Sequence, residues 1–273
     1  MLSFGHRDTS GLLASPAISL ALYCLLSILL CSVGIFASWQ IIVIPVFLLA
    51  FICFIASFAR NHMLCSITKN DLMLLIMATL IGTAITMYLF VLPLDGPSSF
   101  NQDADNTFHL SLIKSFSMSG VRCPIHSSLY YDLNQLSANG EVYNPSMSFY
   151  PAAWHMFASL LVNMLNVPIA MAANASLFIF IAVVWPFSSL SLILLLLPNT
   201  RRAWLSGLIA SFAFTAFPWA LLTFGPLYPN IIGLIFVPVT ISQFIYLTSF
   251  RDFKSSSILS NLAVFILTAV SLC

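Results

Sequence analysis

Residues 72–94 read LMLLIMATLIGTAITMYLFVLPL, a stretch that is apolar almost throughout and contains no charged side chain. A helix needs roughly 20 apolar residues to cross the hydrocarbon core of a bilayer, so this stretch is long enough to span it. Similar uncharged stretches recur along the chain, and together they predict spans at residues 12–38, 40–59, 72–94, 169–197, 204–224, 231–250 and, incompletely, 258–273. The sequence therefore predicts an all-α, polytopic transmembrane helical bundle.

The composition excludes a soluble protein. Of the 273 residues, 60% are hydrophobic and 6% are charged, whereas soluble globular domains carry about 25% charged residues. The net charge is +1 and no run of Lys or Arg occurs, so we expect no nucleic-acid partner and take the lipid bilayer as the main one. The six cysteines lack the spacing of a zinc site, and we interpret each as a small apolar residue.

The basic residues predict the orientation, because cytoplasmic loops of membrane proteins carry an excess of Lys and Arg. A cytoplasmic N-terminus with residues 95–168 outside makes these basic residues cytoplasmic: Arg7, Arg60, Lys69, Arg201, Arg202, Arg251 and Lys254. This arrangement requires that residues 151–167 do not cross, and that segment is short for a span. We therefore predict a multi-pass protein of the cell membrane whose extracytoplasmic loop, residues 95–168, carries amphipathic juxtamembrane helices.

The last apolar stretch, residues 258–273, ends at Cys273 with no charged or aromatic anchor after it. It is about one turn short of a comfortable crossing. We therefore expect residues 1–273 to form a single transmembrane domain that is truncated at its C-terminus, and the natural chain to continue beyond Cys273.

Acidic residues are concentrated in the extracytoplasmic loop. Five of the eight acidic residues of the chain lie there: Asp95, Asp103, Asp105, Asp132 and Glu141. The complete spans contain no ionisable Asp, Glu, Lys, Arg or His, although ion-coupled transporters usually need such groups at membrane depth. We therefore expect the chemistry of this chain to lie in the loop.

The segment from Asp105 to Gly120 is predicted to be a helix with one apolar face. At 100° per residue that face holds Asp105, Phe108, His109, Leu112, Ile113 and Phe116. A carboxylate and an imidazole one turn apart on an apolar face are costly unless they are paired or used. Two simpler interpretations remain open: Asp103 or Asp105 caps the helix, or His109 is hydrogen-bonded to Asp105. The DxD pattern of Asp103 and Asp105 could also hold a divalent cation, Mg or Mn.

A second group of residues is Tyr150-Pro151-Ala-Ala-Trp154-His155. Pro151 suits the first turn of a helix, and Tyr150 and Trp154 are side chains typical of a membrane interface. His155 has no such structural explanation, so we assign it a functional role.

Together these residues resemble the GT-C superfamily, multi-span glycosyltransferases that use polyprenyl-phosphate-linked sugars. Over residues 72–200 the chain is more closely similar to an uncharacterised, actinobacterial-type membrane family that is itself GT-C-like. The motifs that carry this similarity are Gln102-x-x-Asp105-x-x-Phe108-His109-Leu110, Tyr150-Pro-Ala-Ala-Trp-His155 and Asn174…Val184-Trp185-Pro186. The resemblance implies that a loop carboxylate, Asp105 or Asp103, is the catalytic base and that the juxtamembrane helices form a donor groove.

The resemblance leads us to expect glycosyl transfer from a polyprenyl-phosphate donor, a lipid-linked sugar, at the extracytoplasmic face. An aspartate would deprotonate the acceptor hydroxyl. The expected catalytic residues are Asp105, Asp103 and His109, and the expected substrate-binding residues are Tyr150, Trp154, His155 and Arg122. Two alternatives remain open: a permease or flippase subunit for a lipid-linked glycan, and a non-catalytic membrane assembly protein.

Overall fold

The structure is a computed structural model that describes residues 7–33, 35, 38–59, 69–119, 122, 150–197, 200–223 and 227–249. Within these residues every regular element is a helix. The described residues include these helices, each long and apolar enough to cross a membrane: Leu12–Ser32, Lys69–Val91, Ile169–Leu196, Arg201–Thr223 and Tyr228–Ile245. The predicted all-α polytopic helical bundle is therefore confirmed, and the protein is a multi-pass membrane protein.

The helices follow one another along the chain with few long connections. Their bounds are α1 (Arg7–Ser32), α2 (Trp39–Ala59), α3 (Lys69–Thr86) with the π-helix η2 (Met87–Val91), α4 (Ala104–Ser119), α5 (Ala153–Leu165), α6 (Ile169–Ile179) with the π-helix η4 (Phe180–Val184), α7 (Trp185–Leu196), α8 (Arg201–Ala213) with the π-helix η5 (Thr215–Ala220), α9 (Leu221–Thr223) and α10 (Tyr228–Ser249). The predicted last span, residues 258–273, lies outside the described residues, as do loop residues His126, Asp132 and Glu141.

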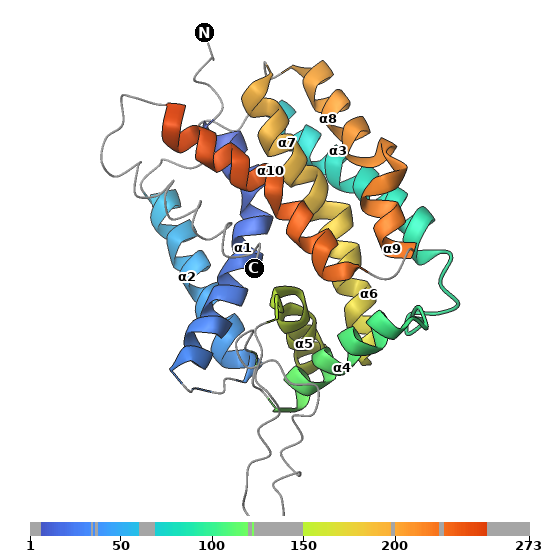
Figure 1. The fold of residues 1–273 in the computed structure, drawn as a ribbon. Coiled ribbons are helices and arrows are strands. Elements are labelled where there is room, and N and C mark those ends of the chain that lie inside the picture. The colour runs from blue at the N-terminus through green and yellow to red at the C-terminus, as the bar shows by residue number, and fades with distance from the viewer. Residues whose placement is uncertain are drawn as a thin grey trace, which may run out of the picture.

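The centre of the bundle is α7, which packs against α10, α8 and α1 (Figure 1). Buried hydroxyl groups join α7 to α10. The N–H of Val239 donates to Ser188 Oγ at 3.1 Å, and the hydroxyl groups of Ser191 and Ser242 lie 3.3 Å apart. Small and hydroxyl-bearing residues are typical of contacts between membrane helices, where they allow close approach and interhelical hydrogen bonds.

One cysteine departs from the interpretation made from the sequence. Cys24 is free and buried in α1, as expected for a small apolar residue. Cys31, two turns further along the same helix, is disulfide-bonded, so for Cys31 that interpretation is wrong. The spacing of cysteines along the chain does not reveal which of them folding brings together.

Two helices, α4 and α5, lie together at one end of the bundle (Figure 1). With 13 residues, α5 is about 20 Å long, which is short of the roughly 30 Å of a hydrocarbon core. Its first turns are buried, and it ends at Asn166 in the left-handed conformation, with a φ of 53°. The juxtamembrane placement of this helix and the orientation of the chain stay predictions.

Candidate functional site

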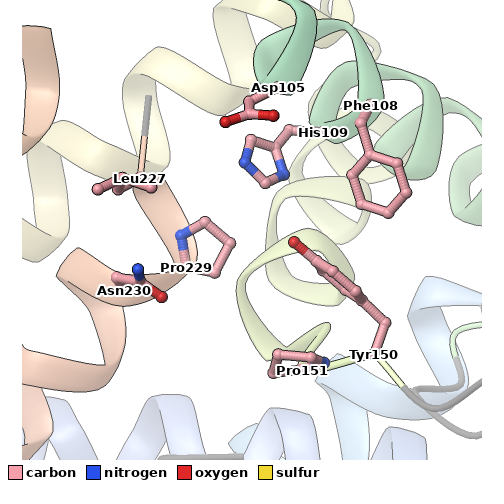
Figure 2. Close-up of a pocket in the computed structure, with 8 residues that line it drawn as sticks. All are labelled: Asp105, Phe108, His109, Tyr150, Pro151, Leu227, Pro229 and Asn230. Carbon is pink, nitrogen blue, oxygen red and sulfur yellow. The ribbon is translucent and has the colours of Figure 1, made fainter. Parts of the chain in front are cut away.

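A pocket of about 340 Å³ lies where the start of α4, the residues before α5 and the start of α10 meet (Figure 2). Its wall combines acidic, imidazole and amide groups with aromatic and apolar ones. The lining residues are Asp105, Phe108, His109, Tyr150, Pro151, Leu227, Pro229 and Asn230. Its volume lies within the range of about 300–1,000 Å³ that is usual for ligand pockets.

The two aspartates at the start of α4 have different roles. The N–H of Asp105 donates to Asp103 Oδ1 at 3.1 Å, and the N–H of Thr107 donates to the Asp103 carbonyl at 3.1 Å. Asp103 is therefore the N-cap of α4, the position at which an aspartate oxygen satisfies a free helix N–H. The capping interpretation thus applies to Asp103, and the Asp105 side chain remains available to the pocket.

The apolar face predicted for α4 is largely present. His109, Leu112, Ile113 and Phe116 are buried, and Phe108 is half-buried. Asp105 differs from the expectation, because its side chain is exposed. The reason is that α4 begins at the pocket rather than inside the core. The first turn of its apolar face therefore borders the open pocket, and the following turns pack against protein.

His109, which lines the pocket, forms a pair with His155 behind it. His109 Nδ1 lies 2.9 Å from His155 Nε2, and both side chains are buried. The structure gives His109 a partner that the sequence did not suggest, His155, 46 residues away in the chain. The expected hydrogen bond between His109 and Asp105 stays a prediction. Figure 2 shows the Asp105 carboxylate beside the His109 ring, so carboxylate, imidazole and imidazole follow one another from the pocket inward.

The environment of His155 favours its neutral form. The side chain is fully buried, and its burial lowers the pKa well below the usual value, with the neighbouring His109 lowering it further. His155 Nδ1 is a buried atom with no hydrogen-bond partner among the described residues. These surroundings favour an uncharged His155 imidazole, and among the described residues only its Nε2 has a hydrogen-bond partner.

Of the four residues expected to bind substrate, Tyr150 lines the pocket. Burial raises the pKa of its hydroxyl, and the negative charge of Asp105 raises it further, so Tyr150 is a neutral phenol. Trp154 is almost completely buried, and its Nε1–H donates to Ser176 Oγ at 2.8 Å, which fastens α5 to α6. Trp154 and His155 thus lie behind the wall rather than in it.

The fourth expected residue, Arg122, is buried away from the pocket lining. Its Nε donates to Ser159 Oγ at 2.9 Å, and its Nη2 donates to Asn163 Oδ1. Asn163 in turn donates from Nδ2 to the carbonyl of Ser117, so the group joins α5 to the end of α4. Burial lowers the pKa of Arg122 to about 10, which still leaves the guanidinium charged near neutral pH. Its role in substrate binding stays a prediction.

Sequence reasoning missed the contribution of α10. Leu227, Pro229 and Asn230 line the pocket, and the Tyr228 ring packs against Trp154 at 5.3 Å and against His109 at 6.0 Å. A signal was present: Tyr228-Pro229, at the start of α10, is a second Tyr-Pro pair. The first pair, Tyr150-Pro151, lies just before the N-cap of α5 rather than in its first turn.

Asn174 of α6 also contributes to the shape of the site. Its Nδ2 donates to the carbonyls of Pro97 and Ser99, at 3.1 and 2.7 Å, and so holds the chain that leads into α4. Asn174 is one of the motif residues that carry the family resemblance, and these hydrogen bonds give it a structural role.

The described residues contain no cluster of metal-binding side chains. Among the described residues, no three His, Cys, Asp or Glu side chains come close enough together to hold an ion, and the Asp103 carboxylate already caps α4. Mg²⁺ is often bound by one or two carboxylates together with waters and substrate phosphates, so the Mg or Mn site stays a prediction.

Fold and site define a polytopic α-helical membrane protein with an acidic, imidazole-containing pocket at one end of its bundle. The chain belongs to a family of unknown function, DUF6541, whose model matches residues 1–273. No curated protein and no solved structure matches it.

Proposed function

We propose that the protein is a membrane glycosyltransferase that moves a sugar from a polyprenyl-phosphate donor to an acceptor hydroxyl, with Asp105 as the general base. The observation that carries this proposal is the exposed Asp105 carboxylate in the wall of the pocket. A general base must lie within reach of the proton that it removes. Asp103 is the weaker candidate, because its carboxylate accepts the N–H of Asp105.

The reaction follows from the position of this carboxylate. The acceptor hydroxyl gives its proton to Asp105 while its oxygen attacks the anomeric carbon of the sugar. The bond from that carbon to the donor phosphate breaks, and the polyprenyl phosphate leaves with the electron pair. Phe108 and Tyr150 supply apolar ring faces on the same wall, and Asn230 supplies an amide.

The surface of the bundle suits a lipid-linked donor. Large apolar side chains are exposed on α2 and α3, including Phe47, Phe51, Ile76 and Leu80. Exposed apolar surface of this extent is typical of a membrane-facing region. A polyprenyl chain could therefore stay in the bilayer while its sugar phosphate reaches the end of the bundle that holds the pocket.

The test measures transfer of radiolabelled sugar from a polyprenyl-phosphate donor by the purified chain in lipid nanodiscs. Asp105→Asn should lower turnover by about 10²–10⁴-fold, the usual cost of losing a general base. Asp103→Asn is the matched control, since asparagine also caps helices well and should leave turnover near normal. Equal loss in both variants would contradict the assignment to Asp105.

The same purified protein distinguishes glycosyl transfer from the two alternative functions, a permease or flippase subunit and an assembly protein. Movement of a labelled lipid-linked glycan across proteoliposomes without cleavage of its sugar bond would favour the permease or flippase. Absence of both transfer and movement, in a folded protein, would favour an assembly role.

A further inference from the structure

The His109–His155 pair restricts where protons can sit in the site. A distance of 2.9 Å between His109 Nδ1 and His155 Nε2 is that of a hydrogen bond, which requires one proton between the two nitrogens. A neutral imidazole carries one N–H and one bare nitrogen. The position of the shared proton therefore determines whether the other nitrogen of each ring is protonated.

The first arrangement places the proton on His109 Nδ1. His155 Nε2 then accepts, and a neutral His155 must carry its own proton on Nδ1. That atom is buried and has no hydrogen-bond partner among the described residues. A buried N–H without a partner costs roughly 1–3 kcal/mol, and such groups are rarer in proteins than acceptors that lack a partner.

The second arrangement places the proton on His155 Nε2. His155 Nδ1 is then a bare lone pair in an apolar setting, which is the cheaper state for an atom without a partner. His109 Nδ1 accepts, so a neutral His109 carries its proton on Nε2. A doubly protonated His155 is disfavoured, because it would bury a charge among aromatic rings, with Tyr150 at 5.5 Å and Trp154 at 4.8 Å.

We propose that His155 is a positioning residue: its Nε2–H donates to His109 Nδ1 and fixes His109 as the neutral tautomer with its proton on Nε2. The consequence for the site is that His109 Nε2, the nitrogen that does not bond to His155, carries a proton. Towards Asp105 and the pocket, His109 therefore supplies a hydrogen-bond donor and not a base. Only this consequence rests on the function proposed above.

The aromatic surroundings hold both rings in place for this role. The His109 ring packs edge-on against Phe108 and Trp154, with ring centroids 5.7 Å apart in each case. Trp154 is itself fixed through Ser176. Neither imidazole can rotate without displacing these rings, so the pair stays aligned while a ligand enters.

Nitrogen NMR of the full chain in lipid bilayers tests the tautomer without any activity. Protein labelled with ¹⁵N at histidine is measured near pH 7.5, and difference spectra of His109→Gln and His155→Gln assign the two rings. We expect a protonated Nε2 and a bare Nδ1 on both histidines, with coupling across the bond between them. A protonated Nδ1 on either ring, or an imidazolium, would overturn the proposal.

Two substitutions at position 155 separate positioning from packing. His155→Gln can place an amide N–H where Nε2 lies, whereas the amide of His155→Asn ends nearer to the position of Nδ1. The glutamine variant should keep a single, sharp set of His109 signals, and the asparagine variant should give averaged signals from a ring that is no longer held. Identical His109 signals in both variants would count against positioning, and the wild-type spectrum decides the proposal if a variant fails to fold.

The transfer assay adds a second readout. For histidines that bind a metal, loss of the hydrogen-bond partner typically costs about 10–100-fold. We expect a loss of similar size for His155→Asn, while His155→Gln should stay within a few fold of wild type. If no transfer is found, the function proposed above fails while the tautomer is still decided by NMR. If transfer depends on Asp105 but the tautomer is the other one, this inference alone fails.

Discussion

Gly82 of α3 lies against the carbonyl oxygen of Ala182 in the π-helix η4, so closely that a Cβ on Gly82 would be 2.1 Å from that oxygen. This contact joins α3 to the helix formed by α6 and α7, at the point where one extra residue widens the turn. Widened turns of this kind often occur near functional sites. Here the contact brings the backbones of α3 and η4 close together.

We therefore expect Gly82→Ala to destabilise the protein. The methyl group would meet backbone rather than a flexible side chain, and forcing extra volume into a packed contact typically costs about 1–3 kcal/mol. Thermal unfolding in detergent measures the effect. Gly233→Ala in α10 is the matched control, since a Cβ there would meet no atom within 4 Å, and alanine favours a helix over glycine. Equal melting temperatures for Gly82→Ala and wild type would contradict the tight contact.

The first turn of α4 provides a second prediction. Asp103→Ala removes the oxygen that accepts the N–H of Asp105, so it should lower stability by about 1 kcal/mol, the usual cost of losing an N-cap. Asp103→Asn should restore most of it. Melting temperatures of the three proteins are the measurement, and a destabilised asparagine variant would show that the charge of Asp103, not its capping oxygen, is what matters.

These examples show how far the sequence could predict the site. The apolar period of α4 places His109, Leu112, Ile113 and Phe116 on one face, since a helical face depends only on neighbours along the chain. The same reasoning could not tell that the face opens into a pocket at Asp105, because the opening depends on where α10 begins. Pairs such as His109 with His155 form only when α4 meets α5, and no local pattern specifies that meeting.

The spacing of apolar residues likewise predicts the membrane helices, but not their irregular turns. Residues 169–197 were predicted as one span, and the chain there forms α6, η4 and α7 in direct succession. The π-turn lies where Gly82 packs against Ala182, two residues 100 positions apart in the sequence. A contact of that range leaves no trace in the local pattern.

The buried His155 predicts a pH dependence of stability. Its pKa in the folded protein is well below the ordinary value of about 6.5, so below pH 6.5 the unfolded chain binds a proton that the folded chain does not. Stability should thus be full above that pH and fall as the pH is lowered from 6.5 towards the folded pKa. His109, Tyr150 and Trp154 are the side chains that face this ring.

Melting temperatures of wild type and His155→Gln between pH 8 and pH 5 measure this dependence. The glutamine variant cannot take up the proton, so its stability should decline less over the acidic part of the range. Parallel curves for the two proteins would assign the acid sensitivity to other groups.

The predicted orientation can be tested with one cysteine on each side. In a chain whose native cysteines are replaced by serine, Ser98→Cys lies before α4, and Asn199→Cys lies in the connection between α7 and α8. A membrane-impermeant maleimide applied to intact cells should label position 98 and leave position 199 unlabelled. Labelling of both positions would mean that α5 crosses the membrane or that Ile169–Leu196 does not.

Arg122 allows a structural role to be separated from substrate binding. Arg122→Lys keeps the positive charge but cannot bond Ser159 and Asn163 through separate nitrogens, because a lysine has one nitrogen where arginine has a rigid fork. If the guanidinium mainly joins α5 to the end of α4, stability should fall by about 1–3 kcal/mol, the cost of buried groups left without partners. The catalytic constant, measured below the melting temperature, should change little.

The Asp105→Asn variant should behave in the opposite way, with a normal melting temperature and lost turnover. An Arg122→Lys protein that melts normally but binds donor more weakly would instead place Arg122 in the substrate site.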